Sequence, residues 1–207
     1  MAETARRRQR GGDARAADVL PMAKAVQMVT WLRGSGKLRD SALVAVASGF
    51  GLRISDALSL TWGDVLDDRG GIADAVQIVE HKTKKPRTVF VLPFVADALM
   101  AYRTSVGVAD RGAKLFPGGD ESGQLHRQTA WNLVRAAGKG MGLTLHLSPH
   151  SLRKSFCDYV YSMTRDAIMT ARITGHSNPA QLLHYVGRVA EAEQDVWRRM
   201  AKTLPKA

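Results

Sequence analysis

The sequence contains a single cysteine, Cys157, among 207 residues. One cysteine cannot form a disulfide within the chain, and its use is typical of a reducing cytosol. Six histidines are present, but none stands in a metal-binding pattern such as CxxC or HExxH. A Walker-type GxxxxGKS/T loop is absent as well. We therefore predict a protein that uses no metal, no ATP and no other cofactor.

Long apolar runs are also missing. No stretch approaches the roughly 18 residues that cross a membrane. The first residues, MAETARRRQRGGDAR, lack the apolar segment of a signal peptide. We therefore expect a cytoplasmic protein with no membrane partner. Hydrophobic residues still make up 45% of the chain, which is enough for a buried core.

Acidic residues are few, since 19 Asp and Glu stand against 30 Lys and Arg, for a net charge of +11. The commonest partner of such a basic surface is nucleic acid, and an anionic membrane is second. Residues 1–18 are rich in Arg, Ala and Gly without an apolar period, which indicates a flexible basic arm; a merely solvated tail is the alternative. The arm offers four candidate DNA-binding residues, Arg6, Arg7, Arg8 and Arg10.

The apolar periodicity predicts a mainly helical (α+β) domain with one small antiparallel sheet. Helices are expected over 19–32, 40–50, 94–107, 128–140, 149–163 and 189–204, with a second helical stretch over 51–65 and a short helix from 179 that ends at Gly187. The segments AVQIVEH and RTVFVLP are β-branched and flank the turn-like KTKKP, so they predict a hairpin. Three lysines, Lys82, Lys84 and Lys85, would lie at or near its tip.

The segment PHSLRKSF, residues 149–156, has the features of a helix start that binds an anion. Ser148 is a suitable N-cap, and Pro149 suits the first helical position. His150 and Arg153 are three residues apart and would share a face at the helix N-terminus, where free N–H groups favour an anion. A structural cap, or a contact with an acidic loop, is the alternative interpretation.

Four segments carry a resemblance to a known family. They are GFGLRISDALSLTWGDV, EHKTKKPRTVFVLP, LSPHSLRKSF and ITGHSNPAQLLHYV, in this order. Together they resemble the catalytic domain of the tyrosine recombinases, the phage integrase family, over roughly residues 38–187. The resemblance implies that family's catalytic-domain fold over residues 19–207. It also implies a catalytic set of Arg53, Lys82, His150, Arg153, His176 and the nucleophile Tyr185, supported by Asp56.

The roles of these residues follow from the resemblance. The two arginines would clamp the scissile phosphate, and Tyr185 would attack it. Lys82 would be the general acid, with Lys84 as the alternative. His150 would assist proton transfer at the tyrosine, and His176 would hydrogen-bond the phosphate.

The chemistry agrees with these residue types. Guanidinium groups bind phosphate oxygens bidentately and stabilise charge that develops on them. A tyrosine with a pKa near ~10 is protonated at neutral pH and needs a proton acceptor. A leaving oxygen needs a proton, which a lysine can give when neighbouring cations such as Lys84 and Lys85 lower its pKa.

The resemblance implies a site-specific recombinase that cuts and rejoins double-stranded DNA. The reaction would pass through a 3′-phosphotyrosyl intermediate and a Holliday junction, on DNA of the nucleoid. Integration, excision and inversion are its possible outcomes. Two alternatives stay open: a type IB topoisomerase with the same chemistry, and a DNA-binding regulator that keeps the fold without the activity.

The ends of the chain raise two further expectations. Fewer than forty residues precede the resembling region, so we expect no separate N-terminal DNA-binding domain, as in the short members that invert fimbrial switches; a fragment of a longer protein is the alternative. The helix over 189–204 carries an apolar stripe of Val189, Val196, Met200 and Leu204. In the family this segment often packs on a neighbouring subunit of a tetramer, and folding back on its own domain is the alternative.

Overall fold

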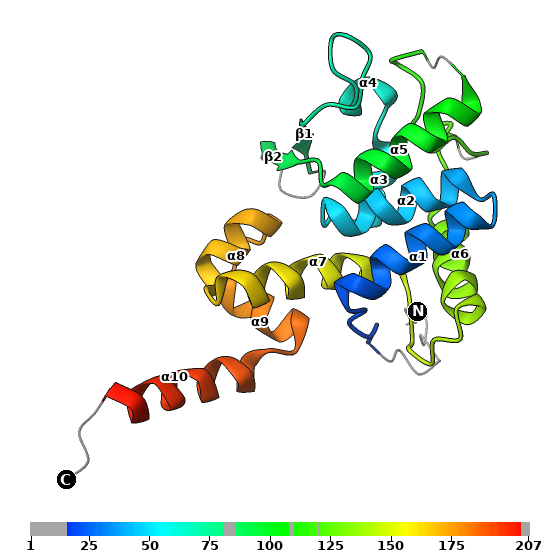
Figure 1. Ribbon diagram of the computed structural model, residues 1–207. Helices are drawn as coiled ribbons and strands as arrows, with labels where there is room; N and C mark the ends of the chain where they lie inside the picture. The colour runs from blue at the N-terminus through cyan, green and yellow to red at the C-terminus, as the bar shows by residue number, and fades with distance from the viewer. Residues whose placement is uncertain (1–15, 81–85, 108–109, 120, 204–207) are drawn as a thin grey trace, which may run out of the picture.

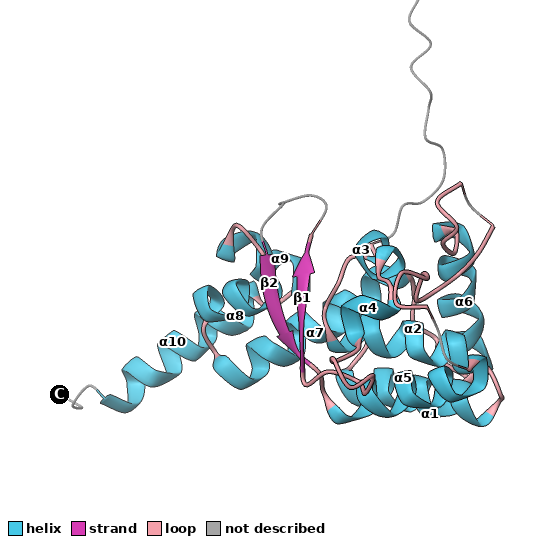
Figure 2. Cartoon of the chain, turned by 90° about the horizontal axis from the view of Figure 1, so that it is seen from above, coloured by secondary structure: helices cyan, strands magenta, loops and turns pink. Residues whose placement is uncertain are grey.

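The computed structural model describes residues 16–80, 86–107, 110–119 and 121–203. Its helices and its one two-stranded antiparallel sheet confirm the predicted mainly helical class (Figures 1 and 2). In chain order the elements are α1 (Met22–Gly34), α2 (Leu38–Gly49), α3 (Ile54–Ser59), α4 (Trp62–Val65), β1 (Ala75–Val79), β2 (Pro86–Phe90), α5 (Pro93–Val106), α6 (Arg127–Gly140), α7 (Pro149–Thr164), α8 (Ala167–Thr174), α9 (Pro179–Val186) and α10 (Val189–Thr203).

Helix α2 is the centre of the main core. Every residue from Ser41 to Gly49 is buried, as the apolar stretch DSALVAVASGF predicts. The helix packs against α1, α5 and α7. Its two buried serines are both hydrogen-bonded: the Ser41 hydroxyl donates to the carbonyl of Val29 at 2.8 Å, and the Ser48 hydroxyl donates to that of Val44 at 2.7 Å. Burying these polar groups therefore leaves no unmet hydrogen bond on either hydroxyl.

The predicted hairpin is present. Its strands pair in the register Val76↔Val89 and Ile78↔Arg87, and exposed and buried residues alternate along β1. Val76, Ile78 and Val89 face the core, so the hairpin is anchored by one apolar face. The hairpin stands between the main body and α8, as Figure 2 shows.

A second, smaller core joins α7, α8 and α9. It consists of four buried residues, Cys157, Ala171, Leu182 and Val186, with Tyr185 packed against them. Helix α7 contributes to both cores, because Leu152 belongs to the main one and Cys157 to the smaller one. The helices that carry the last motif of the sequence are therefore joined to the main body through α7.

The structure differs from the sequence prediction in three details. It adds α8 (Ala167–Thr174), which is not among the predicted helices. The stretch 51–65 is two short helices, because the backbone at Leu60 is extended and Thr61 starts α4 with a capping box to Asp64. The helix predicted over 149–163 extends to Thr164, and Met163 near its end is 71% exposed.

Helix α10 extends away from the rest of the domain (Figure 1). Three of its large apolar side chains are exposed: Val196, Trp197 and Met200. The described part of this helix therefore does not fold back on its own domain. Leu204, the last residue of the predicted stripe, lies outside the described residues. No helix in the described part of the chain has the length and apolar character that a membrane span needs.

Candidate active site

Arg53 is held by two acids at the end of the central helix. It is the N-cap residue of α3, and its side chain is partly exposed. Its Nη1 donates to Oε2 of Glu80 at 2.5 Å and lies 3.9 Å from Oδ2 of Asp56. Both carboxylates are buried, and a buried carboxylate needs a paired cation. Asp56 thus forms the ion pair expected of a support for Arg53, but Glu80 is the closer partner.

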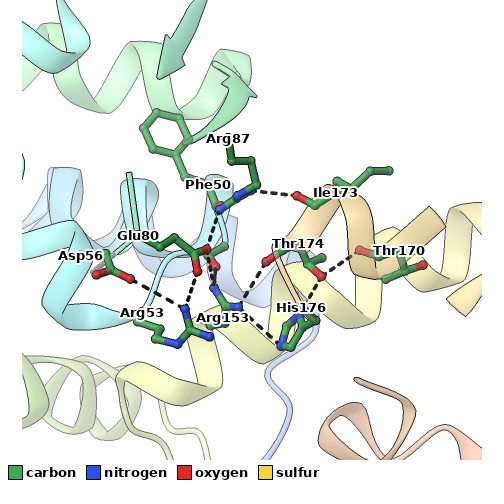
Figure 3. Close-up of polar contacts among 11 residues, drawn as sticks. Phe50, Arg53, Asp56, Glu80, Arg87, Arg153, Thr170, Ile173, Thr174 and His176 are labelled. Atoms are coloured by element: carbon green, nitrogen blue, oxygen red, sulfur yellow. Dashed lines mark hydrogen bonds and ion pairs between the residues drawn. The ribbon is translucent and has the colours of Figure 1, made fainter. Parts of the chain in front are cut away.

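Arg153 joins the ends of two helices (Figure 3). It lies on the second turn of α7 and is only 2% exposed. Its Nη1 donates to the carbonyl of Gly51, just after α2, at 2.5 Å, and its Nη2 donates to the carbonyl of Thr174, at the end of α8, at 3.2 Å. Carbonyls at helix C-termini lack intrahelical donors and favour a cation. Arg153 therefore fixes the spacing between α2 and α8.

His176 lies next to Arg153 and is neutral at pH 7. Nη2 of Arg153 is 3.5 Å from Nε2 of His176, and a guanidinium can only donate, so this nitrogen accepts. Nδ1 then carries the proton and donates to the Thr174 hydroxyl at 2.7 Å, which in turn donates to the carbonyl of Thr170 at 2.8 Å. Burial, and after it the positive charge of Arg153, lowers the pKa of His176 to about 4.

Tyr185 is placed by the short helix α9. The Asn178 side chain caps that helix by accepting from the N–H of Ala180 at 2.9 Å. The helix ends at Gly187, as predicted, and this glycine adopts the left-handed conformation. The Tyr185 ring lies 5.5 Å from the His176 ring, centroid to centroid.

The Tyr185 hydroxyl donates to the backbone carbonyl of His150 at 3.4 Å. The ammonium of Lys154 lies 5.3 Å from the centroid of the tyrosine ring. Burial raises the pKa of Tyr185 above its usual value. The phenol is therefore protonated at neutral pH, and its use as a nucleophile requires a proton acceptor.

His150 occupies the first turn of α7. The structure confirms Ser148 as the N-cap, whose side chain accepts from the His150 N–H at 3.3 Å, and Pro149 at the first position. Loss of solvent around the ring, and then the charges of Arg153 and Lys154, lower the pKa of His150. His150 and Arg153 are thus close enough to interact electrostatically. That they bind one anion stays a prediction.

Glu80 and Arg87 are central to the site, although neither belongs to the predicted catalytic set. Arg87 Nη2 and Arg153 Nη1 lie 3.6 and 3.7 Å from Oε1 of Glu80. The sequence does contain a signal for Glu80: it continues the alternation of Val76 and Ile78, so it should face inward. An inward acid requires a cationic partner, and Arg87 follows the turn on the facing strand.

The charges at the centre of the site leave one positive charge unbalanced. Three arginines, Arg53, Arg87 and Arg153, face two carboxylates, Glu80 and Asp56, so the sum is three minus two, or +1. This balance suits a singly charged anion such as a phosphodiester. Within the described ranges, no group of three His, Cys, Asp or Glu side chains could hold a metal ion.

Several candidate residues lie outside the described part of the chain. They are the hairpin lysines Lys82, Lys84 and Lys85 and the arm arginines Arg6, Arg7, Arg8 and Arg10. Ala17 and Asp18, at the end of the predicted arm, are bound to the domain. The Lys154 ammonium donates to the Ala17 carbonyl at 2.8 Å, and the His146 N–H donates to the Asp18 carboxylate at 2.7 Å.

The site's segments match a family model. The model of the phage integrase family matches residues 18–191. The chain belongs to the phage integrase family. Among its relatives, a tyrosine recombinase XerD of Corynebacterium glutamicum is 29% identical over 167 residues, which cover 78% of this chain and 52% of that protein. A probable integrase/recombinase YoeC of Bacillus subtilis is 30% identical over 149 residues, covering 72% of this chain and 77% of that protein.

Solved structures share the fold of this phage integrase family member. The crystal structure of XerA recombinase covers 96% of the chain at a TM-score of 0.69 and 20% identity, and the match covers 67% of that structure. The Tn1549 transposon integrase in complex with transposon right end DNA gives a TM-score of 0.67 at 19% identity, over 91% of this chain and 68% of that one. These likenesses confirm the recombinase catalytic-domain fold. The chain spans about half the length of the XerC and XerD relatives that it matches.

Proposed function

We propose that this protein is a site-specific DNA recombinase that cuts and rejoins double-stranded DNA through a covalent 3′-phosphotyrosyl intermediate. Membership of the phage integrase family and the names of its relatives support the proposal. The observation that carries it is the convergence of separate elements: buried Arg153 contacts His176, and the ring of His176 lies against that of Tyr185. Integration, excision or inversion would follow from the arrangement of the DNA sites.

The reaction divides among the residues as follows. Arg53 and Arg153 bind the non-bridging oxygens of the scissile phosphate and stabilise the charge that grows there. The oxygen of Tyr185 attacks phosphorus, the bond to the 5′ oxygen breaks, and His150 assists removal of the phenol proton. His176 donates to the phosphate from Nε2, which requires that the Thr174 hydroxyl turn to donate to Nδ1 and that Nη2 of Arg153 turn from Nε2 to the phosphate. Reversal with a second 5′ hydroxyl rejoins the strand.

A suicide substrate tests this proposal. DNA from the flanks of the gene is nicked so that the cleaved end diffuses away, and a chelator is present throughout. A 5′-end label upstream of the cut is expected to move with the protein on a denaturing gel, and the Tyr185→Phe variant is expected to form no adduct. Binding without any adduct would favour the regulator alternative. Relaxation of plasmids that lack a target site would favour the topoisomerase.

Lys82 is proposed as the general acid that protonates the leaving 5′ oxygen, with Lys84 as the alternative. A substrate with sulfur in place of this oxygen tests the assignment, because a thiolate leaves without a proton. Lys82→Ala is expected to lose adduct formation on ordinary DNA and to regain it on the sulfur substrate. Rescue of Lys84→Ala instead would transfer the role to Lys84. A Lys82→Ala loss that sulfur does not repair would contradict general acid catalysis by Lys82.

Residues 19–207 are proposed to form the catalytic domain, and residues 1–18 a basic arm that contacts DNA phosphates. Each phosphate contact steepens the fall of log K with log salt by about 0.9 on duplex DNA. Replacement of Arg6, Arg7, Arg8 and Arg10 by Gln should therefore flatten the slope by up to about 4. An unchanged slope would mean that the arm is only a solvated tail. Lys84 and Lys85 of the hairpin are proposed as further DNA contacts.

Helix α10 is proposed to pack on a second copy and so to link four copies on DNA. The exposed Val196, Trp197 and Met200 support this idea, because a monomer gains nothing by exposing them. Trp197→Asp should then reduce the mass of the DNA complex measured by light scattering, while a single copy still binds a half-site. A tetramer that survives this change would exclude the helix as the link.

We further propose that the protein works on nucleoid DNA in the cytoplasm.

A further inference from the structure

Two arginines join the same pair of helices by parallel sets of hydrogen bonds. Arg87 of β2 donates to the carbonyl of Phe50, at the end of α2, at 3.1 Å and to that of Ile173, in α8, at 2.8 Å. Arg153 donates to the carbonyl of the following residue in each case. The two guanidiniums therefore form two consecutive rungs between α2 and α8 (Figure 3). Arg87 adds the hairpin to this connection.

The Glu80 carboxylate lies at the centre of these rungs. Its Oε2 accepts from Arg53, and its Oε1 lies within 3.7 Å of both other guanidiniums. A Cβ atom at Gly175 would lie 2.7 Å from Oε1, so the carboxylate is packed directly against the turn that precedes His176. Among the described residues, Oε1 has no partner at hydrogen-bonding distance although Glu80 is only 1% exposed. Its place is therefore set by charge and by packing.

We propose that Glu80 and Arg87 are positioning residues of this protein's active site, an inference that rests on the proposed function. Glu80 holds the Arg53 guanidinium in place relative to Arg153 before DNA arrives. Arg87 fastens the hairpin to the end of α8 and so sets the position of the turn that carries His176. Neither residue needs to touch the scissile phosphate. Preset geometry lowers the barrier, because displacement of a reacting group by about 1 Å can cost roughly 100-fold in rate.

Glu80→Gln tests the first part, since it keeps the shape against Gly175 and removes the charge. On the suicide substrate, at a temperature where circular dichroism shows a folded protein, the adduct rate at saturating DNA should fall about 10- to 100-fold. The apparent Kd for DNA should stay within about threefold of the wild-type value. The substitution removes a negative charge that repels DNA, so it should not weaken binding. In an Arg53→Lys background the same change should cost less than about threefold, because Glu80 acts through Arg53. Asp97→Asn, at an exposed acid of α5, is the charge-matched control.

Arg87→Lys tests the second part and remains informative if Glu80→Gln does not fold. A lysine keeps the charge beside the carboxylate but cannot donate to both carbonyls as the guanidinium does. The adduct rate should fall at least about tenfold, and by much less in a His176→Ala background. Arg33→Lys, on an exposed turn of α1, is its control.

Two results would overturn this inference and leave the proposed function standing. The first is a wild-type adduct rate in both variants. The second is the same loss of rate with and without the background substitution, Arg53→Lys or His176→Ala. A wild-type protein that binds DNA and forms no adduct would instead overturn the proposed function, and this inference with it.

Discussion

Replacement of Arg153 by alanine should damage the fold as well as the chemistry. The side chain is 2% exposed and donates to two backbone carbonyls, and the Glu80 carboxylate lies 3.7 Å away. Its loss would orphan both carbonyls and remove one of the cations around a buried acid. Breaking such a buried pair costs about 3–5 kcal/mol, a large part of the roughly 5–15 kcal/mol that stabilises a typical domain.

Arg53 provides the comparison. Its side chain is 27% exposed, and its loss removes one short bond, to Glu80, and the 3.9 Å pair with Asp56. Two other arginines stay beside Glu80, so Arg53→Ala should cost less, about 1.5–3 kcal/mol in stability. Urea denaturation followed by tryptophan fluorescence measures both free energies of unfolding. Arg153→Lys should be intermediate, since it keeps the charge and one carbonyl contact. The reasoning would be refuted if Arg153→Ala lay within about 1 kcal/mol of wild type, or if both alanine variants lost equal stability.

Three further outcomes follow from the buried groups of the smaller core and the site. Burial raises the pKa of Cys157 to about 11, so iodoacetamide at pH 8 should label this thiol only in urea; rapid labelling of the folded protein, seen by mass spectrometry, would contradict this. The pKa of His176 is lowered to about 4 when folded against 6.5 when unfolded, so the unfolded chain binds more protons and stability should fall as pH drops from about 6.5 to 4; an identical pH slope in His176→Asn would argue against it. Gly175→Ala should destabilise more than Gly142→Ala, because both have positive φ but only the first would bring a Cβ against Glu80; equal melting temperatures would oppose this.

Most of the helices, the hairpin and the start of α7 were predictable, because local signals determine them, whereas the short helix α8 (Ala167–Thr174) was not predicted. Alternation of apolar residues identified the strands, and Ser148 with Pro149 identified the start of α7. The break at Leu60 was not predicted, because the backbone there follows from the capping of α4 and from a bridge between Thr61 and Lys114, fifty-three residues along the chain. Contacts over such a distance leave no periodic signal.

The resemblance predicted the candidate site only where motif residues form it. The resemblance singled out Arg53, Arg153 and His176, and the structure brings them into one network. The resemblance gave no indication that Glu80 is the acid closest to Arg53. The direction of α10 could not be predicted either, since an apolar stripe such as that around Val196 packs equally well within one chain or between two.

The nucleotide-bearing peptide of the covalent adduct tests the central claim most directly. The adduct with 5′-labelled suicide DNA is digested with nuclease and trypsin, and the modified peptide is sequenced by mass spectrometry. We expect a single modified peptide, in which the 3′ phosphate of the DNA is esterified to the oxygen of Tyr185. A DNA bond at any other residue, or an adduct that persists in Tyr185→Phe, would contradict the assignment of this tyrosine and of the site built around it.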